Sequence, residues 1–349
     1  MPPLATSPHK KPLPNLLVRS QLDLVFQRFH AHGLLLIFGV ILASIVGCQP
    51  TTQNTQKTTQ SSTDLSSNNI VTTSYPLQWV TQQITGDNYQ VDFHASDSSH
   101  PDRWRPDRET IAEIQAADLI VCNGIAAPYA NWMKTVSLPS SKVIESASKG
   151  MSLSDFISVE DIRLVHSHGP EGEHSHPTMV SRTWLSPSML SKQASFIAKE
   201  LSKRFPNDAS TFQQNLTVLQ KTLKSSVPQS LLATQLVFSA TPELKFLTKT
   251  VGIEDSHFNW NENTTLTEVE ASFASQPQGV ASNFILFPRR LEALADRIQP
   301  VLQKRKLTPI FIDMLDQPDP NRDFMTRLKT NFERMQKLTA GQYSNLPVK

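Results

Sequence analysis

The sequence predicts an α/β protein of two Rossmann-like α/β lobes bridged by a long helix. Short apolar runs alternate with helical patterns from about residue 70 to 144, and the alternation starts again near residue 236. Such alternation indicates parallel strands in a sheet that helices cover on both faces. Between the two halves, four apolar residues at helical spacing predict the connecting helix: Phe212, Leu216, Leu219 and Leu223. An ordinary packing helix within one domain is the alternative. A ligand would then lie in a cleft between the lobes, beyond the carboxyl ends of the strands.

The first lobe is expected over residues 70–206. Its strands are expected at residues 70–73, 89–93, 118–122 and 143–144. A helix begins at Pro76, whose fixed φ suits a first turn, and Gly86 ends it. A second helix begins near Arg108 with Asp107 as its N-cap. A third helix runs from Pro187 to about Arg204.

The second lobe is expected over residues 231–349, after a linking helix over residues 207–230. Its strands are expected at residues 236–238, 284–286 and 309–312. One helix contains Leu244 and Leu247, and another begins at Pro288. Asp313 follows the last strand directly, at the edge of the sheet where open α/β proteins bind ligands.

Residues 1–47 have the pattern of a secretory signal peptide. A basic segment precedes the uncharged apolar stretch from Gly33 to Gly47, which is short for a stable membrane span. Ile45-Val46-Gly47-Cys48 resembles a bacterial lipobox, in which Cys48 becomes the lipidated first residue. A retained membrane anchor is the alternative. Residues 48–69 are almost all Gln, Thr, Ser and Asn, so we expect a flexible polar tether.

Composition and motifs argue against several functional classes. The formal net charge is only +2, and basic residues of the first 47 supply it, so the body offers no basic field to nucleic acid. No Gly-rich phosphate loop, His-Glu-x-x-His motif or nucleophile elbow occurs, so we do not expect an enzyme. Cys122, one of two cysteines, ends an apolar strand pattern and is expected to be an inert core thiol.

Four of the ten histidines fall within residues 166–176, here called the His-rich stretch. They form two His-x-His pairs: His166, His168, His174 and His176. Gly, Pro and two glutamates lie between the pairs, so we expect a loop rather than a helix or strand. Imidazole nitrogens together with carboxylate oxygens suit zinc and, less selectively, other transition metals. A solvated loop without metal is the alternative.

Several motifs together resemble the zinc and manganese solute-binding proteins of metal ABC transporters. They are His100-Pro101-Asp102-Arg103-Trp104-Arg105-Pro106-Asp107, Ala117-Asp118-Leu119 with Asn123-Gly124, Tyr75-Pro76-Leu77, and Thr183-Trp184-Leu185-Ser186-Pro187. Their order and spacing hold from about residue 70 to 313. The resemblance implies two α/β lobes bridged by a rigid helix, with a metal ion in the cleft as transported ligand.

The resemblance also implies four metal ligands, namely three histidines and one carboxylate. His100 matches the first histidine, and Asp313 matches the carboxylate. Arg182 and Ala240 occupy the positions of the other two histidines, and Phe287 replaces a glutamate found in some members. Alanine donates nothing, and a protonated arginine repels a divalent cation at close range.

Three interpretations of the cleft remain open, because zinc normally takes at least three protein ligands. His100 and Asp313 could form a rearranged site with a further donor such as His94 or His257. Arg182 could instead pair with Asp313 and close a metal-free cleft. Lastly, Arg182 could help to hold an anion or a metal chelate.

The sequence and the resemblance predict a surface-tethered solute-binding lipoprotein that captures a divalent transition metal for an ABC importer. Zn²⁺ is expected first and Mn²⁺ second, as cargo rather than as catalytic cofactor. The expected partners are an ABC permease and, through lipid on Cys48, the membrane of a bacterial cell envelope, with a monomeric body in the periplasm or extracytoplasmic space. The alternative is a divergent relative with a degenerate cleft, which buffers metal or binds a partner through its His-rich stretch.

Overall fold

The computed structural model describes residues 68–125, 128–160, 166–167, 173–174, 177–228, 236–276 and 282–339. All of them belong to one compact unit of the chain, Ser61–Lys349. None of the helices formed by these residues is long and apolar enough to cross a bilayer. The expected signal peptide and nearly all of the tether, with Cys48, lie outside the described residues, so these two expectations stay predictions.

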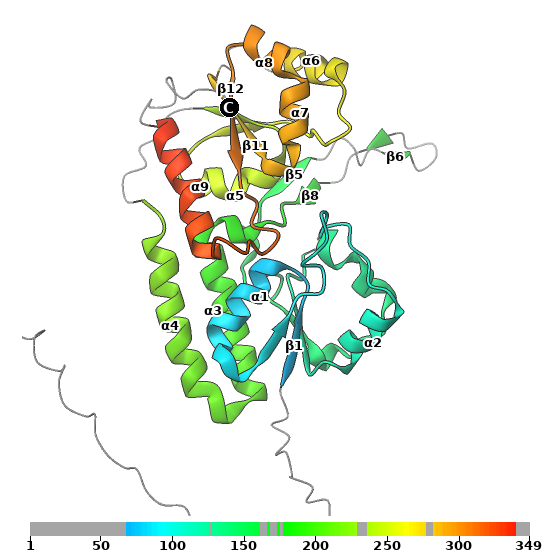
Figure 1. The fold of residues 1–349 in the computed structure, drawn as a ribbon, viewed down its shortest axis with the longest axis vertical. Helices are drawn as coiled ribbons and strands as arrows, with labels where there is room; N and C mark the ends of the chain where they lie inside the picture. Colours follow the sequence, from blue (N-terminus) through cyan, green and yellow to red (C-terminus); the bar gives the residue numbers. More distant parts are fainter. Residues whose placement is uncertain are drawn as a thin grey trace, which may run out of the picture. The chain divides into compact units, whose positions relative to one another are not determined.

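The first lobe is built on a parallel four-stranded sheet of order β2-β1-β3-β4. Its strands are β1 (Asn69–Thr72), β2 (Gln90–Asp92), β3 (Leu119–Cys122) and β4 (Val143–Glu145). Helices α1 (Tyr75–Thr85) and α2 (Arg108–Ala116) lie on opposite sides of the sheet (Figure 1). Alternate residues of β1 divide between them, because Ile70 packs with the α1 side and Val71 with the α2 side.

The second lobe repeats this architecture with a parallel sheet of order β10-β9-β11-β12. Its strands are β9 (Val237–Ser239), β10 (Asp255–His257), β11 (Phe284–Pro288) and β12 (Thr308–Ile312). Its helices are α5 (Lys245–Thr250), α6 (Leu266–Ala274), α7 (Glu292–Arg297), α8 (Gln299–Lys304) and α9 (Phe324–Thr339). The predicted fold class, two α/β lobes with parallel sheets, is therefore confirmed, although β10, α6, α8 and α9 were not predicted.

Helices α3 (Pro187–Arg204) and α4 (Ala209–Ser225) pack against each other and against α1 (Figure 1). The buried face of α4 consists of the four residues predicted for it: Phe212, Leu216, Leu219 and Leu223. The helix is shorter than the predicted span of 207–230, because Pro206–Asp208 forms a separate 3-10 turn and Ser226 caps the end. Its role as the link stays a prediction, since residues 229–235 lie outside the described residues.

Local sequence signals place the helix ends where they were expected. Asp107 caps α2, and its side chain accepts a hydrogen bond of 2.8 Å from the Thr110 amide. Gly86 follows α1 with a φ of 66°, a left-handed conformation that favours glycine. Short 3-10 helices connect many of the elements: η1 (Gly86–Asn88), η2 (Pro128–Thr135), η3 (Ser140–Lys142), η4 (Leu153–Asp155), η7 (Thr183–Leu185), η8 (Pro206–Asp208), η9 (Pro242–Leu244) and η10 (Arg289–Leu291).

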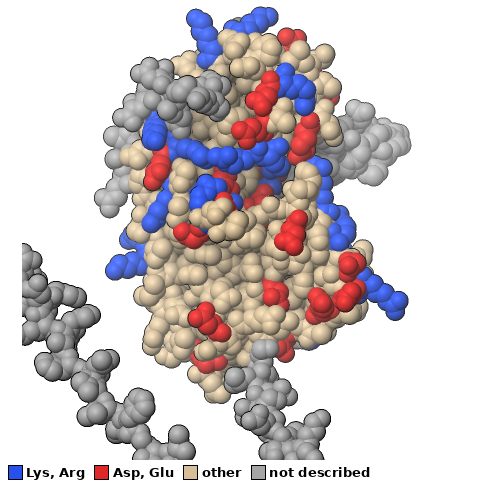
Figure 2. Space-filling view, viewed as in Figure 1, with Lys and Arg blue, Asp and Glu red and all other residues tan. Residues whose placement is uncertain are grey.

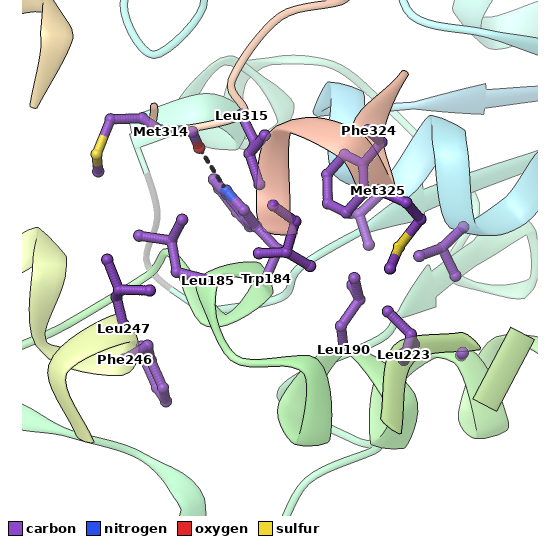
Figure 3. Packing of buried hydrophobic residues seen from close by; sticks show 14 of the residues in the cluster. Trp184, Leu185, Leu190, Leu223, Phe246, Leu247, Met314, Leu315, Phe324 and Met325 are labelled. Carbon is purple, nitrogen blue, oxygen red and sulfur yellow. Dashed lines mark hydrogen bonds between the residues drawn. The ribbon is translucent and has the colours of Figure 1, made fainter. Parts of the chain in front are cut away.

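One hydrophobic cluster contains residues from both lobes. Trp184 and Leu185 of η7 lie beside Leu247 of α5 and the segment after β12 (Figure 3). The indole Nε1 of Trp184 donates a hydrogen bond of 2.9 Å to the Met314 carbonyl oxygen. A buried tryptophan stabilises a core through its large apolar area, and this hydrogen bond means that its N–H is not left without a partner. The two sheets therefore share one hydrophobic cluster, which includes Trp184.

Two small antiparallel sheets lie between β4 and α3 in the sequence. Strand β5 (Ser158–Glu160) pairs with β8 (Pro177–Met179), and β6 (His166–Ser167) pairs with β7 (Glu173–His174). The expectation that residues 166–176 contain no strand is wrong for these four residues. The residues that suggested a loop, Gly169, Pro170 and Gly172, lie between the two strands in the sequence and outside the described residues.

Candidate functional site

The positions singled out by the sequence lie in the segments that follow the strands. His100 is in the loop after β2, and Arg182 directly precedes η7. Ala240 follows the end of β9, and Asp313 follows the end of β12. The carboxyl ends of the parallel strands therefore supply three of these positions, as expected for a ligand site in an open α/β sheet.

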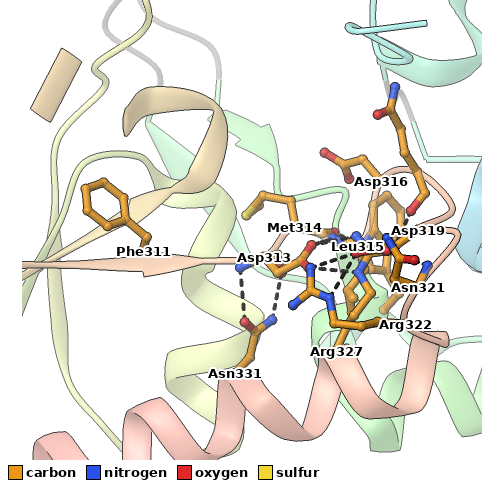
Figure 4. Close-up of polar contacts among 12 residues, drawn as sticks. Phe311, Asp313, Met314, Leu315, Asp316, Asp319, Asn321, Arg322, Arg327 and Asn331 are labelled. Carbon is orange, nitrogen blue, oxygen red and sulfur yellow. Dashed lines mark hydrogen bonds and ion pairs between the residues drawn. The ribbon is translucent and has the colours of Figure 1, made fainter. Parts of the chain in front are cut away.

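Asp313 is buried and its carboxylate is held by Arg327 of α9 (Figure 4). Arg327 donates from Nε to Oδ2 at 2.8 Å and from Nη2 to Oδ1 at 2.7 Å. The Leu315 amide donates a third hydrogen bond to Oδ1 at 2.9 Å. Burial alone would raise the pKa of Asp313, but the bonds and charge of Arg327 outweigh it and hold this pKa below its ordinary value. A metal ion at Asp313 would have to displace the Arg327 guanidinium or share the Asp313 carboxylate with it.

Arg182 is only 1 % exposed and pairs with two carboxylates of the second lobe. Its Nη1 lies 2.6 Å from Oε1 of Glu243, and its Nη2 lies 3.1 Å from Oδ2 of Asp316. Burial, the larger effect, raises the pKa of both carboxyl groups, and the charge of Arg182 lowers it. The pKa of Asp316 is raised because burial prevails, whereas the pKa of Glu243 is lowered because Arg182 and Arg290 together prevail.

These contacts extend into a continuous series of ion pairs, here called the ion-pair chain. Arg290 lies 2.5 Å from Oε2 of Glu243 through Nη2 and 3.4 Å from Oε1 of Glu262 through Nε. Arg103 lies 3.2 Å from Oε2 of Glu262. The complete chain, in order, is Arg103, Glu262, Arg290, Glu243, Arg182 and Asp316. Figure 2 shows Lys and Arg in a band across the middle of one face, with Asp and Glu beside them.

Ala240 cannot contribute a metal ligand and is fully buried. Its amide donates to the Leu286 carbonyl oxygen at 2.8 Å, and its own carbonyl oxygen accepts from the Trp260 amide at 2.9 Å. It packs in a cluster with Phe258, Trp260 and Phe287. Phe287, where some family members have a glutamate, is likewise a fully buried core residue.

The two histidines suggested as further donors are His94, in the loop after β2, and His257, in the second sheet. His94 lies 3.7 Å from Glu113 through Nδ1, and its buried Nε2 has no hydrogen-bond partner among the described residues. His257 is in β10, where burial first and the charge of Lys245 second lower its pKa. Nowhere in the described part of the chain do three or more His, Cys, Asp or Glu side chains group as a metal site. The rearranged site with His100 and Asp313 therefore finds no third donor there.

The pairing proposed between Arg182 and Asp313 needs correction. The structure pairs Arg182 with Asp316 and Glu243, and gives Asp313 to Arg327. That Arg182 stands at a metal-ligand position of the family stays a prediction. Sequence reasoning missed Glu243, Glu262, Arg290 and Asp316, although each lies within a few residues of a strand's carboxyl end.

Two cavities of useful size lie elsewhere. One of ≈ 360 Å³ is lined by residues 257–261, 263–264 and 275–276 and by α6, and one of ≈ 390 Å³ lies between α1, α4 and the start of α9. Neither lining includes His100, Arg182, Ala240 or Asp313. Cys122 is buried without a disulfide, and burial raises the pKa of its thiol to about 12, as expected for an inert core residue.

In the His-rich stretch the structure describes the backbone of β6 and β7. His166 is paired with His174, and Ser167 with Glu173, in an antiparallel register. His168 and His176 lie outside the described residues, so their predicted role as ligands stays a prediction.

Comparison with known proteins places the chain. The family described as zinc-uptake complex component A, periplasmic, matches residues 70–337. The chain is 28% identical over 166 residues to the zinc-binding lipoprotein AdcA of Streptococcus pneumoniae, covering 45% of this chain and 31% of that protein. It is 32% identical over 149 residues to the high-affinity zinc uptake system protein ZnuA of Bacillus subtilis, covering 42% of this chain and 45% of that protein. The matches thus span less than half the length of these relatives.

A solved structure supports the fold independently. The solute-binding protein FpvC of Pseudomonas aeruginosa in complex with Mn²⁺ aligns with a TM-score of 0.62 at 17% identity. The alignment covers 79% of this chain and 98% of that one. At this identity the likeness concerns the fold, which is the same pair of parallel sheets.

Proposed function

The chain belongs to the zinc-uptake complex component A family, and from this premise we propose that it is a solute-binding protein that captures a divalent metal for an ABC importer. The observation that carries the proposal is the family match over residues 70–337, which includes both sheets. The metal is cargo, and the family is one of solute-binding proteins rather than enzymes. An ABC permease is the proposed partner of the folded body, which would act as a monomer.

Zinc is the metal proposed first. The two relatives described above carry zinc in their names or roles, and clustered imidazoles suit zinc. Manganese is proposed second, because the carboxylates that follow the strands of the second sheet are oxygen donors, which manganese accepts.

The His-rich stretch is proposed as an accessory point of metal capture, beside the interlobe site. Its register sets His166 opposite His174 in the antiparallel pair of β6 and β7. On this proposal the four histidines of the stretch supply imidazoles to the metal. Between the lobes, His100 and Asp313 are the remaining family ligands, but Asp313 would first have to leave Arg327.

A second candidate function is favoured by one specific observation, the burial of Arg182 between Glu243 and Asp316. On this proposal the chain is a divergent relative with a degenerate interlobe site. It buffers metal, or binds a partner, through the His-rich stretch while the lobes serve as a scaffold. Both candidates place the protein at the cell envelope, tethered by lipid on Cys48 with its body outside the cytoplasm.

One experiment separates the two candidates. The full chain and a form lacking residues 166–176 are purified without metal, loaded with zinc or manganese, desalted, and analysed by mass spectrometry of the elements. Zinc retained by the shortened form, and lost on His100→Ala, supports capture between the lobes. Zinc retained only by the full chain supports the second candidate. If neither form retains either metal, both proposals fail.

A further inference from the structure

The ion-pair chain joins the two lobes through charged side chains alone. Arg103 and Arg182 come from the first lobe, whereas the three carboxylates and Arg290 come from the second. Arg103 reaches Glu262 at one end, and Arg182 reaches Glu243 and Asp316 at the other. The chain therefore crosses from lobe to lobe at two separate places.

Charge within the chain is balanced. Three guanidinium groups face three carboxylates, so the chain as a whole presents no net charge to an incoming ion. Glu243 is central, since Oε1 faces Arg182 of the first lobe at 2.6 Å and Oε2 faces Arg290 at 2.5 Å. Guanidinium–carboxylate contacts of this length are among the stronger hydrogen bonds in proteins.

The buried end of the chain is fixed by its surroundings. Arg182 is 1 % exposed, while Arg103 at the other end is 61% exposed in its side chain. Two residues from Arg182, the Trp184 indole donates to the Met314 carbonyl oxygen, and Met314 is two residues from Asp316. Polar pairing and apolar packing thus hold the same two segments together.

We propose that the ion-pair chain is an internal latch, in which the Arg182 guanidinium stands in for a cargo cation and keeps the two lobes together without metal. Binding proteins with two lobes commonly close when a ligand bridges both. Here a side chain of the first lobe already supplies the positive charge that bridges to carboxylates of the second. A metal ion then has little differential affinity for a closed form and cannot shift the equilibrium between open and closed forms.

The latch rests on the second candidate function, in which metal binds at the His-rich stretch and not between the lobes. Metal capture at the His-rich stretch is compatible with latched lobes, and latched lobes are compatible with no metal binding at all. Failure of the latch and failure of the proposed function are therefore distinguishable.

Hydrogen–deuterium exchange on the full chain tests the latch, with peptides covering residues 181–186 and 313–317 as reporters. In the wild type, exchange in these peptides should be the same in excess chelator and in excess zinc. Glu243→Gln removes the central charge and should accelerate their exchange in chelator by roughly ten- to a hundredfold, the effect of losing a buried charged hydrogen bond. Glu145→Gln, which removes the 2.7 Å pair with Lys149 inside the first lobe, is the matched control and should leave them unchanged.

A milder variant covers the case in which Glu243→Gln does not fold. Arg103→Gln breaks only the exposed end of the chain and should accelerate exchange in the same peptides by about two- to fivefold. Zinc that slows exchange of these peptides in the wild type would overturn the latch, because the lobes would then close on cargo. So would unchanged exchange in whichever of the Glu243 and Arg103 variants folds.

Discussion

Arg327 of α9 holds Asp313 by two parallel hydrogen bonds, of 2.8 Å to Oδ2 and 2.7 Å to Oδ1. The pair is buried, and Asn331 of the same helix bonds both main-chain groups of Asp313. The carboxylate that the family resemblance assigns to metal is thus tied to the C-terminal helix. This pairing has consequences for stability as well as for metal affinity.

The first prediction concerns the stability of this pair. Arg327→Met should lower the free energy of unfolding by about 3–5 kcal/mol, because it leaves the Asp313 carboxylate buried without its partner. The double variant Arg327→Met with Asp313→Asn should recover part of the loss, because no unpaired charge remains. Urea denaturation of the four proteins in a double-mutant cycle measures the coupling. Additive losses would mean that the pair is not coupled.

The second prediction concerns acid. Asp313 and Glu243 have lowered pKa values in the fold, so their contribution to stability is fully present above their ordinary values of 3.8 and 4.5. It is lost as pH falls through the lowered values. Asp316 has the opposite sign, since its raised pKa means that protonation favours the fold. The pKa values of Glu262 and Glu200 are lowered as well, by nearby arginine and lysine side chains against the effect of burial, so we expect a net loss of stability below pH about 4.

Urea midpoints between pH 7 and pH 3 check this balance. Asp313→Asn should flatten the acid limb of the profile, and Asp316→Asn should steepen it. A wild-type midpoint that stays constant down to pH 3 contradicts the assignment of these shifts.

Local signals explain why the lobes were predictable from the sequence. Pro76 and Gly86 bracket α1, Asp107 caps α2, and Pro187 opens α3, each through the conformation of its own backbone or side chain. Apolar runs in the sequence predicted seven of the eight strands of the two main sheets. Strand β10 was missed because Asp255, Ser256 and His257 are polar, and only pairing with β9 makes them a strand.

Helix α9 was missed although its sequence carries a signal. Phe324, Leu328, Phe332, Met335 and Leu338 recur at helical spacing and are all buried. Because α9 was not predicted, Arg327 was not recognised as the partner of Asp313.

The carboxylates that pair with the arginines could not be predicted from such local signals. Arg182 and Glu243 are far apart in the chain, and which carboxylate meets which guanidinium depends on how two lobes pack. The family resemblance predicts that Arg182 stands at a ligand position, but a single sequence does not show which carboxylates this arginine pairs with.

The third prediction concerns anchoring. If Ile45-Val46-Gly47-Cys48 is a lipobox, radiolabelled palmitate should enter the wild-type protein and Cys48→Ala should abolish it. Cys122→Ala is the matched control and should leave labelling unchanged, because this thiol is buried. Absence of label from the wild type would refute lipid attachment.

The fourth prediction concerns the His-rich stretch. Deleting residues 166–176 should change the free energy of unfolding, measured by thermal denaturation, by no more than about 0.5 kcal/mol, as for surface changes away from a core. The amount of zinc that the deletion form binds, measured by isothermal titration calorimetry, should be a small fraction of the amount that the full chain binds. In the intact chain, binding should weaken near pH 5 as imidazoles protonate. Equal zinc binding by both forms would exclude the stretch as the point of capture.

The last prediction concerns the interlobe site, where the fold is that of a metal-binding family and the side chains are not. Arg182→His with Ala240→His, made in the form without residues 166–176, restores the ligand set that the resemblance implies with His100 and Asp313. Zinc affinity against a competing chelator should rise by about two orders of magnitude or more, since two nitrogen donors replace a cation and a methyl group. Removal of Arg182 also frees Glu243 and Asp316, whose charge then favours a cation.

The matched control separates these two effects. Arg182→Gln with Ala240→His frees the same carboxylates but adds only one imidazole, so it should gain much less affinity than the double histidine variant. Ala240 is fully buried against aromatic side chains, and an imidazole there costs about 1–3 kcal/mol through overpacking. Far-UV circular dichroism must therefore show both variants folded. If the folded double histidine variant binds zinc no better than its control, Arg182 does not occupy the position of a metal ligand.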